Sequence, residues 1–262
     1  MNNKERDRIL SKYNHIFKNE KKYYSKMKPL PGKIINLEEQ SFFRLVNVKF
    51  KKMIGNVKGK KILDVGCGRG DLSLYLAQQG ANVIGIDLSN NHIDLCKTRG
   101  NDLNLKVNFM VMNAQVPDFE DNVFDIIVGS RIIHHLPDIE LFTRECKRLL
   151  RKKGFITFIE PLKKNPIVEL NRKIFAPKKR TKHEHPLFIK DVMIAQKIFG
   201  NMEHSEFFIL SPFARVIQSF MKNPNIFRVA YKFLNFIEKP LYKINFLRQF
   251  HWQIVFKSVK TQ

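Results

Sequence analysis

Long apolar runs and cysteines are scarce in this 262-residue chain, and each scarcity excludes a class of protein. No run of about 18 uncharged apolar residues occurs, and charge begins at Lys4, so we expect neither a membrane span nor a signal peptide. The three cysteines, Cys67, Cys96 and Cys146, form no metal or disulfide pattern, which favours reduced thiols in a cytoplasmic protein. A hydrophobic content of 44% predicts a globular chain rather than a disordered one.

Negative charge is scarce outside the middle of the chain. Residues 59–160 carry 13 basic and 13 acidic side chains, whereas residues 1–58 carry 15 against 5 and residues 161–262 carry 19 against 6. The net charge of +23 therefore belongs to the flanks. Such flanks suit nucleic acid, an anionic lipid surface or an anionic substrate, and a lysine-rich solvated surface is the simpler alternative.

Three glycines at alternate positions follow the first predicted strand of the cofactor-binding core. The apolar run from Lys61 to Val65 predicts a buried strand, and Gly66, Gly68 and Gly70 follow it at alternate positions. A helical pattern begins at Asp71, and a second apolar run, residues 82–87, ends on Asp87. This is a strand, loop, helix and strand unit whose final carboxylate is placed to accept both hydroxyls of a ribose.

The spacing of these glycines separates two cofactor classes. Dinucleotide folds use G-x-G-x-x-G, whereas this loop reads Asp64-Val65-Gly66-Cys67-Gly68-Arg69-Gly70, led by a carboxylate that suits a cation better than a phosphate. The motif resembles the first motif of the class I S-adenosylmethionine-dependent methyltransferases, and the core is similar to the quinone-biosynthesis methyltransferases. Residues 85–87 are similar to the ribose-binding segment of that family. The resemblance implies S-adenosyl-L-methionine as cofactor.

Further segments extend the resemblance over residues 59–160. Residues 113–125, from Asn113-Ala114 through a P-x-F-x-D-x-x-F-D run, resemble the family segment that contacts adenine, and residues 130–138 resemble the segment after the fourth strand. The implied cofactor-binding residues are Asp64, Gly66, Cys67, Gly68, Gly70, Asp87, Leu88, Asn113, Ala114 and Ser130. A nucleophilic role for Cys67 at a helix N-terminus is an alternative to simple packing in the loop.

Histidines supply the acid and base candidates. His134 and His135 follow the expected fourth strand, and imidazole titrates near neutrality, although packing and capping are the alternative for this pair. His183 is a third catalytic candidate. Substrate-binding candidates are Tyr13 in the N-terminal helix, Arg131, His135, Arg172, Arg180 and His185.

Residues 161–188 are long for a connection between a strand and a helix, and such loops at strand ends tend to carry function. Their E-P, N-P and R-T-x-x-E-H-P-L elements resemble an insertion in one bacterial branch of small-molecule methyltransferases. We expect no metal, because His183, Glu184 and His185 are consecutive and do not share a helical face.

The predicted fold is α/β: a doubly wound, seven-stranded, Rossmann-like methyltransferase sheet with six parallel strands and the last antiparallel. Residues 1–58 form an N-terminal helical cap, residues 59–160 the cofactor-binding core, and residues 161–262 complete the same domain with lid insertions at 161–188 and 212–248. We expect one helix from Arg6 to about Met27 and another over 37–57. Further helices are expected from the N-cap Ser89 to about Thr98, from Pro137-Asp138 to Leu150 with a C-terminal turn at 152–154, and from Ile189 to Phe199.

The predicted function is transfer of a methyl group to a small or lipophilic acceptor by in-line displacement under a helical lid. The aromatic and basic insertion at 212–248 suits a cap over substrate, a peripheral contact with an anionic inner-membrane surface, or a partner interface. Methylation of RNA through the basic flanks is one alternative, although no RNA-binding module is present in the sequence. A non-catalytic, cofactor-binding membrane-surface protein is another.

Overall fold

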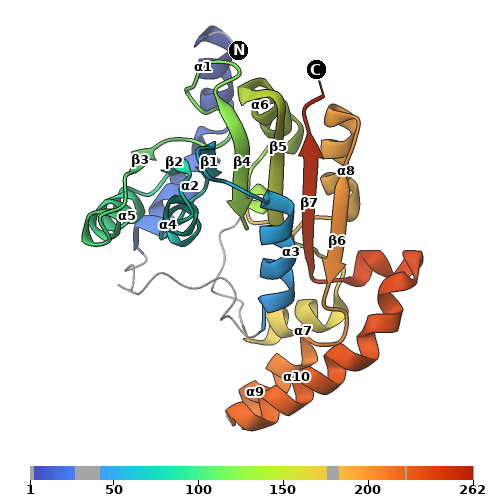
Figure 1. The fold of residues 1–262 in the computed structure, drawn as a ribbon. Helices are drawn as coiled ribbons and strands as arrows, with labels where there is room; N and C mark the ends of the chain where they lie inside the picture. The colour runs from blue at the N-terminus through green and yellow to red at the C-terminus, as the bar shows by residue number, and fades with distance from the viewer. Residues whose placement is uncertain (1–2, 27–41, 176–182, 222, 262) are drawn as a thin grey trace.

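The computed structural model describes residues 3–26, 42–175, 183–221 and 223–261. Its centre is a seven-stranded sheet in the order β3-β2-β1-β4-β5-β7-β6 (Figure 1). The strands are β1 (Lys61–Val65), β2 (Asn82–Asp87), β3 (Val107–Val111), β4 (Phe124–Ser130), β5 (Leu150–Pro161), β6 (Glu203–Phe207) and β7 (Gln253–Val259). Because β7 is antiparallel to both neighbours, β6 runs with the other five strands. The predicted topology is therefore confirmed.

Helices cover both faces of the sheet because each buries one apolar stripe against it. On one face, α3 (Arg44–Ile54) and α4 (Asp71–Gln78) contribute Val46, Phe50 and Leu76 to a cluster with Ile62 and Val128 of the sheet. α5 (Asn90–Asp102) packs beside α4.

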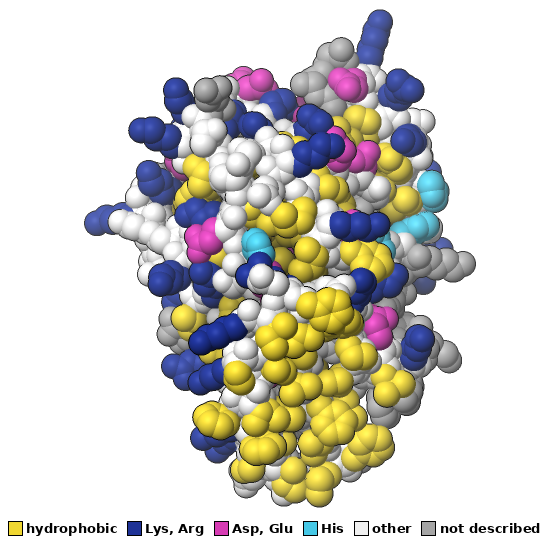
Figure 2. All heavy atoms as spheres, turned by 90° about the vertical axis from the view of Figure 1, so that its right-hand side faces the viewer, with side chains coloured by type: hydrophobic (Ala, Val, Ile, Leu, Met, Phe, Trp, Pro, Cys, Tyr) yellow, Lys and Arg dark blue, Asp and Glu magenta, His cyan; other side chains and the backbone are white. Residues whose placement is uncertain are grey.

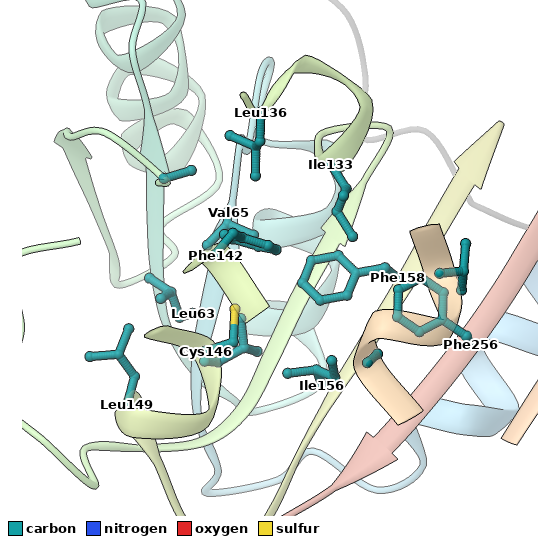
Figure 3. Packing of buried hydrophobic residues seen from close by; sticks show 14 of the residues in the cluster. Leu63, Val65, Ile133, Leu136, Phe142, Cys146, Leu149, Ile156, Phe158 and Phe256 are labelled. Carbon is teal, nitrogen blue, oxygen red and sulfur yellow. The ribbon is translucent and has the colours of Figure 1, made fainter. Parts of the chain in front are cut away.

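The opposite face is covered by α6 (Ile139–Leu149) and α8 (Ile189–Phe199), whose bounds match the predicted helices closely. Phe142 and Cys146 of α6 point toward Leu63 and Phe158 of the sheet (Figure 3). All four side chains are at most 2% exposed. The strand segment that leads into the glycine loop is therefore held by packing on both of its faces.

Two element boundaries differ from the sequence prediction. Residues 152–154 are not a helical turn: β5 begins at Leu150, and main-chain hydrogen bonds join Lys153 and Gly154 to Lys260. The single N-terminal helix is also wrong, because α1 (Asn3–Lys12) and α2 (Asn14–Lys26) are separated at Tyr13. α2 buries Phe17 and Glu20, whereas the described side chains of α1 are exposed or half-buried. Of the helix predicted over 37–57, residues 37–41 lie outside the described residues.

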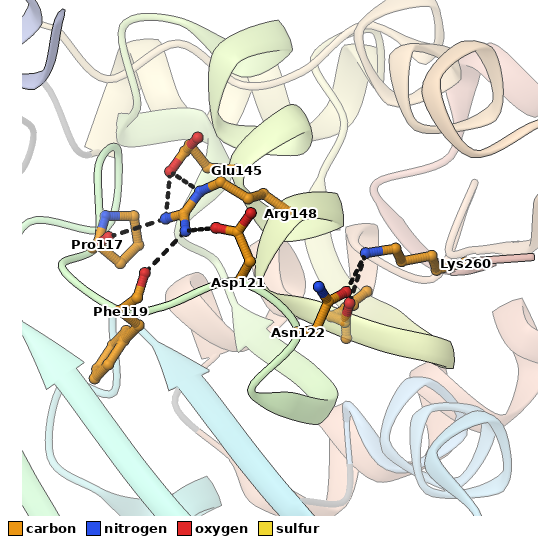
Figure 4. Close-up of polar contacts among 8 residues, drawn as sticks. Pro117, Phe119, Asp121, Asn122, Glu145, Arg148 and Lys260 are labelled. Atoms are coloured by element: carbon orange, nitrogen blue, oxygen red, sulfur yellow. Dashed lines mark hydrogen bonds and ion pairs between the residues drawn. The ribbon is translucent and has the colours of Figure 1, made fainter. Parts of the chain in front are cut away.

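The loop before β4 is organised by one arginine on α6. The Arg148 guanidinium donates to the carbonyl of Phe119 at 2.8 Å and pairs with Asp121 at 2.6 Å and Glu145 at 2.8 Å (Figure 4). Lys260, just after β7, donates to the side chain of Asn122 at 2.9 Å. These contacts hold the P-x-F-x-D segment against the sheet. Phe119 and Asp121 of this segment therefore have a structural role.

The additional helices lie beyond the carboxyl ends of the parallel strands (Figure 1). They are α7 (Pro166–Phe175), α9 (Phe213–Met221), α10 (Pro224–Glu238) and the short 3₁₀ segments η2 (Lys239–Lys243) and η3 (Asn245–Phe250). Asn165 is fully buried and donates to the carbonyls of Phe208, Ile209 and Phe250. The buried Glu238 carboxylate accepts the amide hydrogens of residues 209–211. Buried polar anchors thus attach the insertions to the sheet.

Candidate active site

The glycine loop after β1 has a backbone that needs glycine. Gly66, Gly68 and Gly70 have φ values of 64°, 53° and 76°, in the left-handed region. A Cβ on Gly66 would lie 2.6 Å from a side-chain carbon of Ile132, whereas one on Gly68 would meet nothing within 4 Å. The middle of the loop therefore faces open space, as a main chain that cradles a ligand requires.

Asp87, at the end of β2, is fixed beside this loop. Its Oδ2 accepts the amide hydrogen of Gly68 at 3.0 Å, and its Oδ1 accepts that of Ser89 at 2.8 Å. Ser89 is the predicted N-cap of α5, and its Oγ accepts from the amide of His92. Main-chain donors that follow β1 and β2 thus orient the carboxylate of Asp87.

A cavity with an empty volume of about 830 Å³, mouth included, opens over the carboxyl ends of the strands. Seven of the ten predicted cofactor-binding residues line it: Gly66, Gly68, Asp87, Leu88, Asn113, Ala114 and Ser130. A second cavity of about 880 Å³ shares Gly66, Gly68, Ser130 and Arg131 with the first and adds Asp64 and Cys67. Gly70 lines neither of the two; it is the N-cap of α4, packed against Cys96. The two cavities flank the glycine loop and are large enough together for a nucleoside with an amino-acid tail.

Asp64 and Cys67 have unusual protonation properties. Asp64 is 1% exposed, accepts a hydrogen bond of 2.6 Å from Ser73 Oγ, and has its pKa raised to about 7 by burial. A hydrogen bond with Cys96 and burial raise the pKa of the Cys67 thiol well above its usual range. Cys67 is therefore held as a neutral thiol, which favours packing over the nucleophilic alternative.

The two adjacent histidines have different surroundings. His134 is 5% exposed, and its Nδ1 lies 2.7 Å from Oε2 of Glu160. The other oxygen of Glu160 accepts the amide hydrogens of Ile132 and Ile133, both at 2.8 Å. His134 is absent from the residues that line the first cavity. It therefore braces the segment after β4, in agreement with the packing and capping alternative.

His135 faces the first cavity and has two partners from α2. Its Nδ1 lies 3.1 Å from Oε2 of Glu20, and its Nε2 lies 3.1 Å from the hydroxyl of Tyr24. Burial raises the pKa of Tyr24, so its hydroxyl stays protonated. Glu20 is 3% exposed, and nothing in the lysine-rich stretch of sequence around it marks it as a buried residue. An imidazole with a buried carboxylate beside it is an arrangement able to accept a proton from a bound molecule.

The predicted substrate-binding residues do not gather in one place. Arg131 lines both cavities from the end of β4, with an unusual φ of 59° for a side chain of its size. The hydroxyl of Tyr13 lies 3.5 Å from Asp138, outside the lining of either cavity. Arg172 pairs with Glu169 and lines a separate cavity between α7 and α9. Arg180 lies outside the described residues.

His183 and His185 are also away from the first cavity. Nε2 of His183 lies 3.4 Å from the side-chain nitrogen of Asn19, and Nδ1 of His185 lies 2.9 Å from the carbonyl oxygen of His183. The structure thus gives neither histidine a contact that suits catalysis. Within the described ranges, no three His, Cys, Asp or Glu side chains are grouped so as to hold a metal ion.

Comparison with known proteins agrees with this geometry. Residues 63–158, from the middle of β1 to the end of β5, match a family model described as a methyltransferase domain. This part of the chain is therefore similar to a methyltransferase domain. That domain includes the glycine loop, Asp87, Asn113 and both adjacent histidines. The match supports the predicted family over these residues.

Curated relatives match about two fifths of this chain. The ubiquinone biosynthesis O-methyltransferase of Coxiella burnetii is 34% identical over 113 residues, which are 43% of this chain and 48% of that protein. The protein of the same name from Pelagibacter ubique is 37% identical over 108 residues, 41% of this chain and 44% of that one. This chain thus spans about half the length of the curated relatives it matches.

Solved structures extend the likeness of fold beyond the methyltransferase domain. Haemonchus contortus phosphoethanolamine N-methyltransferase 2, in complex with phosphomonomethylethanolamine and S-adenosylhomocysteine, has a TM-score of 0.60 at 19% identity, covering 92% of this chain and 60% of that one. Geranyl diphosphate C-methyltransferase from Streptomyces coelicolor A3(2) also has a TM-score of 0.60, at 13% identity, covering 94% of this chain and 98% of that one. These likenesses establish the fold.

Proposed function

We propose that this protein transfers a methyl group from S-adenosyl-L-methionine to a small or lipophilic acceptor. The observation that carries the proposal is the cavity in which Asp87, held by the amides of Gly68 and Ser89, faces an open glycine loop. The ubiquinone biosynthesis O-methyltransferases that match the domain support a small-molecule acceptor. The two structural neighbours are named for methylation of phosphoethanolamine and of geranyl diphosphate, which are also small molecules.

The residues around the cavity fit the proposed cofactor. Asp87 would accept the ribose hydroxyls, Asn113 and Ala114 would contact adenine, and the loop amides would follow the methionine part toward Ser130. The cofactor supplies an electrophilic methyl group on a sulfonium when it is bound. The work left to the protein is to align the acceptor and to exclude water. Phe17, Tyr24 and Leu136 form apolar walls suited to that task.

His135 is the proposed base for an acceptor that carries a proton. Nδ1 of His135 lies 3.1 Å from a carboxylate oxygen of Glu20, and Nε2 lies 3.1 Å from the Tyr24 hydroxyl. The acceptor's proton would pass to the oxygen of Tyr24 while the hydroxyl proton of Tyr24 passes to Nε2. Glu20 then stabilises the imidazolium that forms. A neutral amine needs no base, so alignment alone would suffice for it. Replacing His135 therefore distinguishes an acceptor that must lose a proton from an amine that is already neutral.

The test is incubation of the protein with methyl-labelled S-adenosylmethionine and a cell extract divided into small-molecule, lipid and RNA fractions. We expect label in the small-molecule or lipid fraction, and at least about tenfold less with Asp87→Ala protein when the cofactor concentration is far below its dissociation constant. Label in RNA, with binding that falls steeply as salt rises, would favour the RNA alternative. Cofactor binding without label in any fraction would favour the non-catalytic alternative.

The helical insertion between β6 and β7 supports a further proposal: it contacts an anionic membrane surface peripherally. Figure 2 shows hydrophobic side chains gathered on the part of the molecule where Figure 1 places α9 and α10. The exposed apolar patch contains Phe220, Met221, Val229, Phe233, Phe236 and Phe246, each at least 56% exposed. Monomeric proteins rarely expose a contiguous patch of this kind without a use for it.

The positive charge of the same segment favours an anionic lipid surface as the binding partner of the patch. Exposed basic side chains accompany the patch: Arg228, Lys232, Lys239, Lys243 and Arg248. The one acid in residues 213–250 is Glu238, which is buried. Apolar side chains with basic neighbours and no exposed acid suit the headgroup region of an anionic bilayer. Among the described residues, no helix is long and apolar enough to cross a membrane.

Vesicle flotation tests the membrane proposal. We expect the protein to float with phosphatidylcholine vesicles containing phosphatidylglycerol, and to float less with pure phosphatidylcholine. The double variant Phe233→Ser, Phe236→Ser should lose binding, whereas Val111→Ser, an exposed apolar residue on β3, should not. Equal binding by the double variant, or a dimer that dissociates in that variant without any vesicle binding, would contradict the lipid assignment.

A further inference from the structure

Glu20 of α2 is an acidic residue that is buried beside the first cavity. It is 3% exposed, and it lines that cavity together with Asp87, Ser130 and His135. Three lysines flank it in the sequence and are exposed: Lys18, Lys21 and Lys22. Glu20 is the one acid of α2. The helix thus directs its neighbouring basic side chains to solvent and places its single carboxylate against the cavity.

The carboxylate of Glu20 lacks the hydrogen bonds that a buried charge normally has. Its Oε2 lies 3.1 Å from Nδ1 of His135, and this is its one ion-pair contact within the described ranges. Neither carboxylate oxygen has a hydrogen-bond partner among the described residues, and Nδ1 of His135 has none either. A buried carboxylate without hydrogen bonds is costly. A molecule that binds in this cavity and brings a positive charge would reduce that cost.

The other charges of the cavity leave the charge of Glu20 without a counterion. Apart from two histidines, the ionisable acids and bases among the described lining residues are Glu20, Asp87 and Arg131. Cζ of Arg131 lies 4.7 Å from the ring centroid of Phe43, and no ion pair joins Arg131 to Glu20 within the described ranges. Burial raises the pKa of the Tyr24 hydroxyl, and the negative charge of Glu20 adds to that effect. The surroundings of Glu20 therefore favour a cation.

The proposed cofactor carries a positive charge between its two ends. Its sulfonium joins the ribose to the methionine part, and the residues proposed for these parts, Asp87 and Ser130, line the same cavity as Glu20. Attraction between unit charges falls only with the inverse of their distance, and it strengthens where bound ligand displaces water. The carboxylate of Glu20 can therefore favour the sulfonium without a direct contact.

We propose that Glu20 distinguishes S-adenosylmethionine from S-adenosylhomocysteine, through attraction of its buried carboxylate to the sulfonium. The proposal rests on the proposed function and adds a specificity-determining residue to that site. On transfer, the sulfur keeps the electron pair of the broken bond to the methyl carbon and becomes a neutral thioether, while the acceptor forms the new bond. For an acceptor that gives its proton to His135, the positive charge moves to an imidazolium beside the same carboxylate. Glu20 thus favours binding of the methyl donor over retention of the product.

Calorimetry with the two ligands tests the proposal, because they differ only in the methyl group and the charge of the sulfur. The measurement is the dissociation constant of S-adenosylmethionine divided by that of S-adenosylhomocysteine, at pH 8, where an ordinary imidazole is mostly neutral. Glu20→Gln should raise this ratio at least about tenfold, since it keeps the size of the side chain and removes its charge. Glu20→Asp should raise it less. Glu120→Gln, an equal charge change at an exposed position, should leave it unchanged.

Binding of S-adenosylhomocysteine by Glu20→Gln protein shows that the variant is folded. Glu20→Ala is a second neutral variant and should raise the ratio as well, so the test does not depend on the folding of one protein. A ratio unchanged in the neutral variants, or an equal weakening of both ligands, overturns the inference while the methyl-transfer proposal stands. Absence of binding of either ligand by the wild type would instead remove the proposed function, and this inference with it.

Discussion

His134 and Glu160 are joined by a contact of 2.7 Å between Nδ1 and Oε2, and the same carboxylate holds the main chain that begins the segment after β4. His134→Ala would leave a fully buried carboxylate oxygen without its partner. We expect a loss of about 2–3 kcal/mol in the free energy of unfolding. Urea denaturation measures it, with the exposed His15→Ala as control. Unchanged stability would mean that the contact is not formed in solution.

His135 should behave differently, because it faces the cavity and not the core. If the acceptor carries a proton, His135→Ala should lower kcat by about 10²–10⁴-fold, as expected for loss of a general base. Glu20→Gln should lower kcat by a smaller factor, since it weakens the orientation of the imidazole but keeps the base. Single-turnover rates with saturating cofactor measure both. Full turnover in His135→Ala, and also in His134→Ala and His183→Ala, would indicate catalysis by alignment alone.

Asp64 makes stability depend on pH. Its pKa is raised by burial to about 7 in the folded protein, so the folded state binds its proton more tightly than the unfolded state does. The resulting stabilisation is present below the unfolded-state pKa near 4 and is lost as the pH rises toward 7. We expect Asp64→Asn to remove this dependence, so that the variant gains on the order of 4 kcal/mol relative to the wild type between pH 4 and pH 8.

Chemical denaturation at several pH values measures this difference. The exposed Asp94→Asn is the matched control and should follow the wild type. A constant difference between wild type and Asp64→Asn across the range would show that Asp64 does not titrate there.

Local patterns were sufficient to predict most of the sheet and the cofactor side of the site. Strand β1, the glycine loop and Asp87 lie within 27 consecutive residues, and periodicity and turn residues determine them. The N-cap Ser89 and the helix Ile189–Phe199 were predicted for the same reason. The start of β5 was missed because pairing with residues after β7, more than 100 positions away, overrides the turn signal of Lys153-Gly154.

The acceptor side could not be predicted, because it depends on contacts between distant segments. Glu20 and Tyr24 reach His135 across more than 100 positions of the sequence, a contact that helical periodicity does not reveal. The roles of His134 and His135 differ by the direction of two adjacent side chains. Arg215 lies in the insertion at 212–248, which the sequence shows only to be aromatic and basic, and its position near the ring of Phe43 depends on the packing of α9.

Calorimetric titration with S-adenosylmethionine tests the central claim most directly. The wild-type protein should bind the cofactor at one site, and Asp87→Ala should bind it at least about tenfold more weakly, because the ribose loses two charge-assisted contacts. Asp94→Ala, an exposed acid on the neighbouring α5, should bind as the wild type does. Absence of binding by the wild type, or an affinity unchanged in Asp87→Ala, would contradict the account.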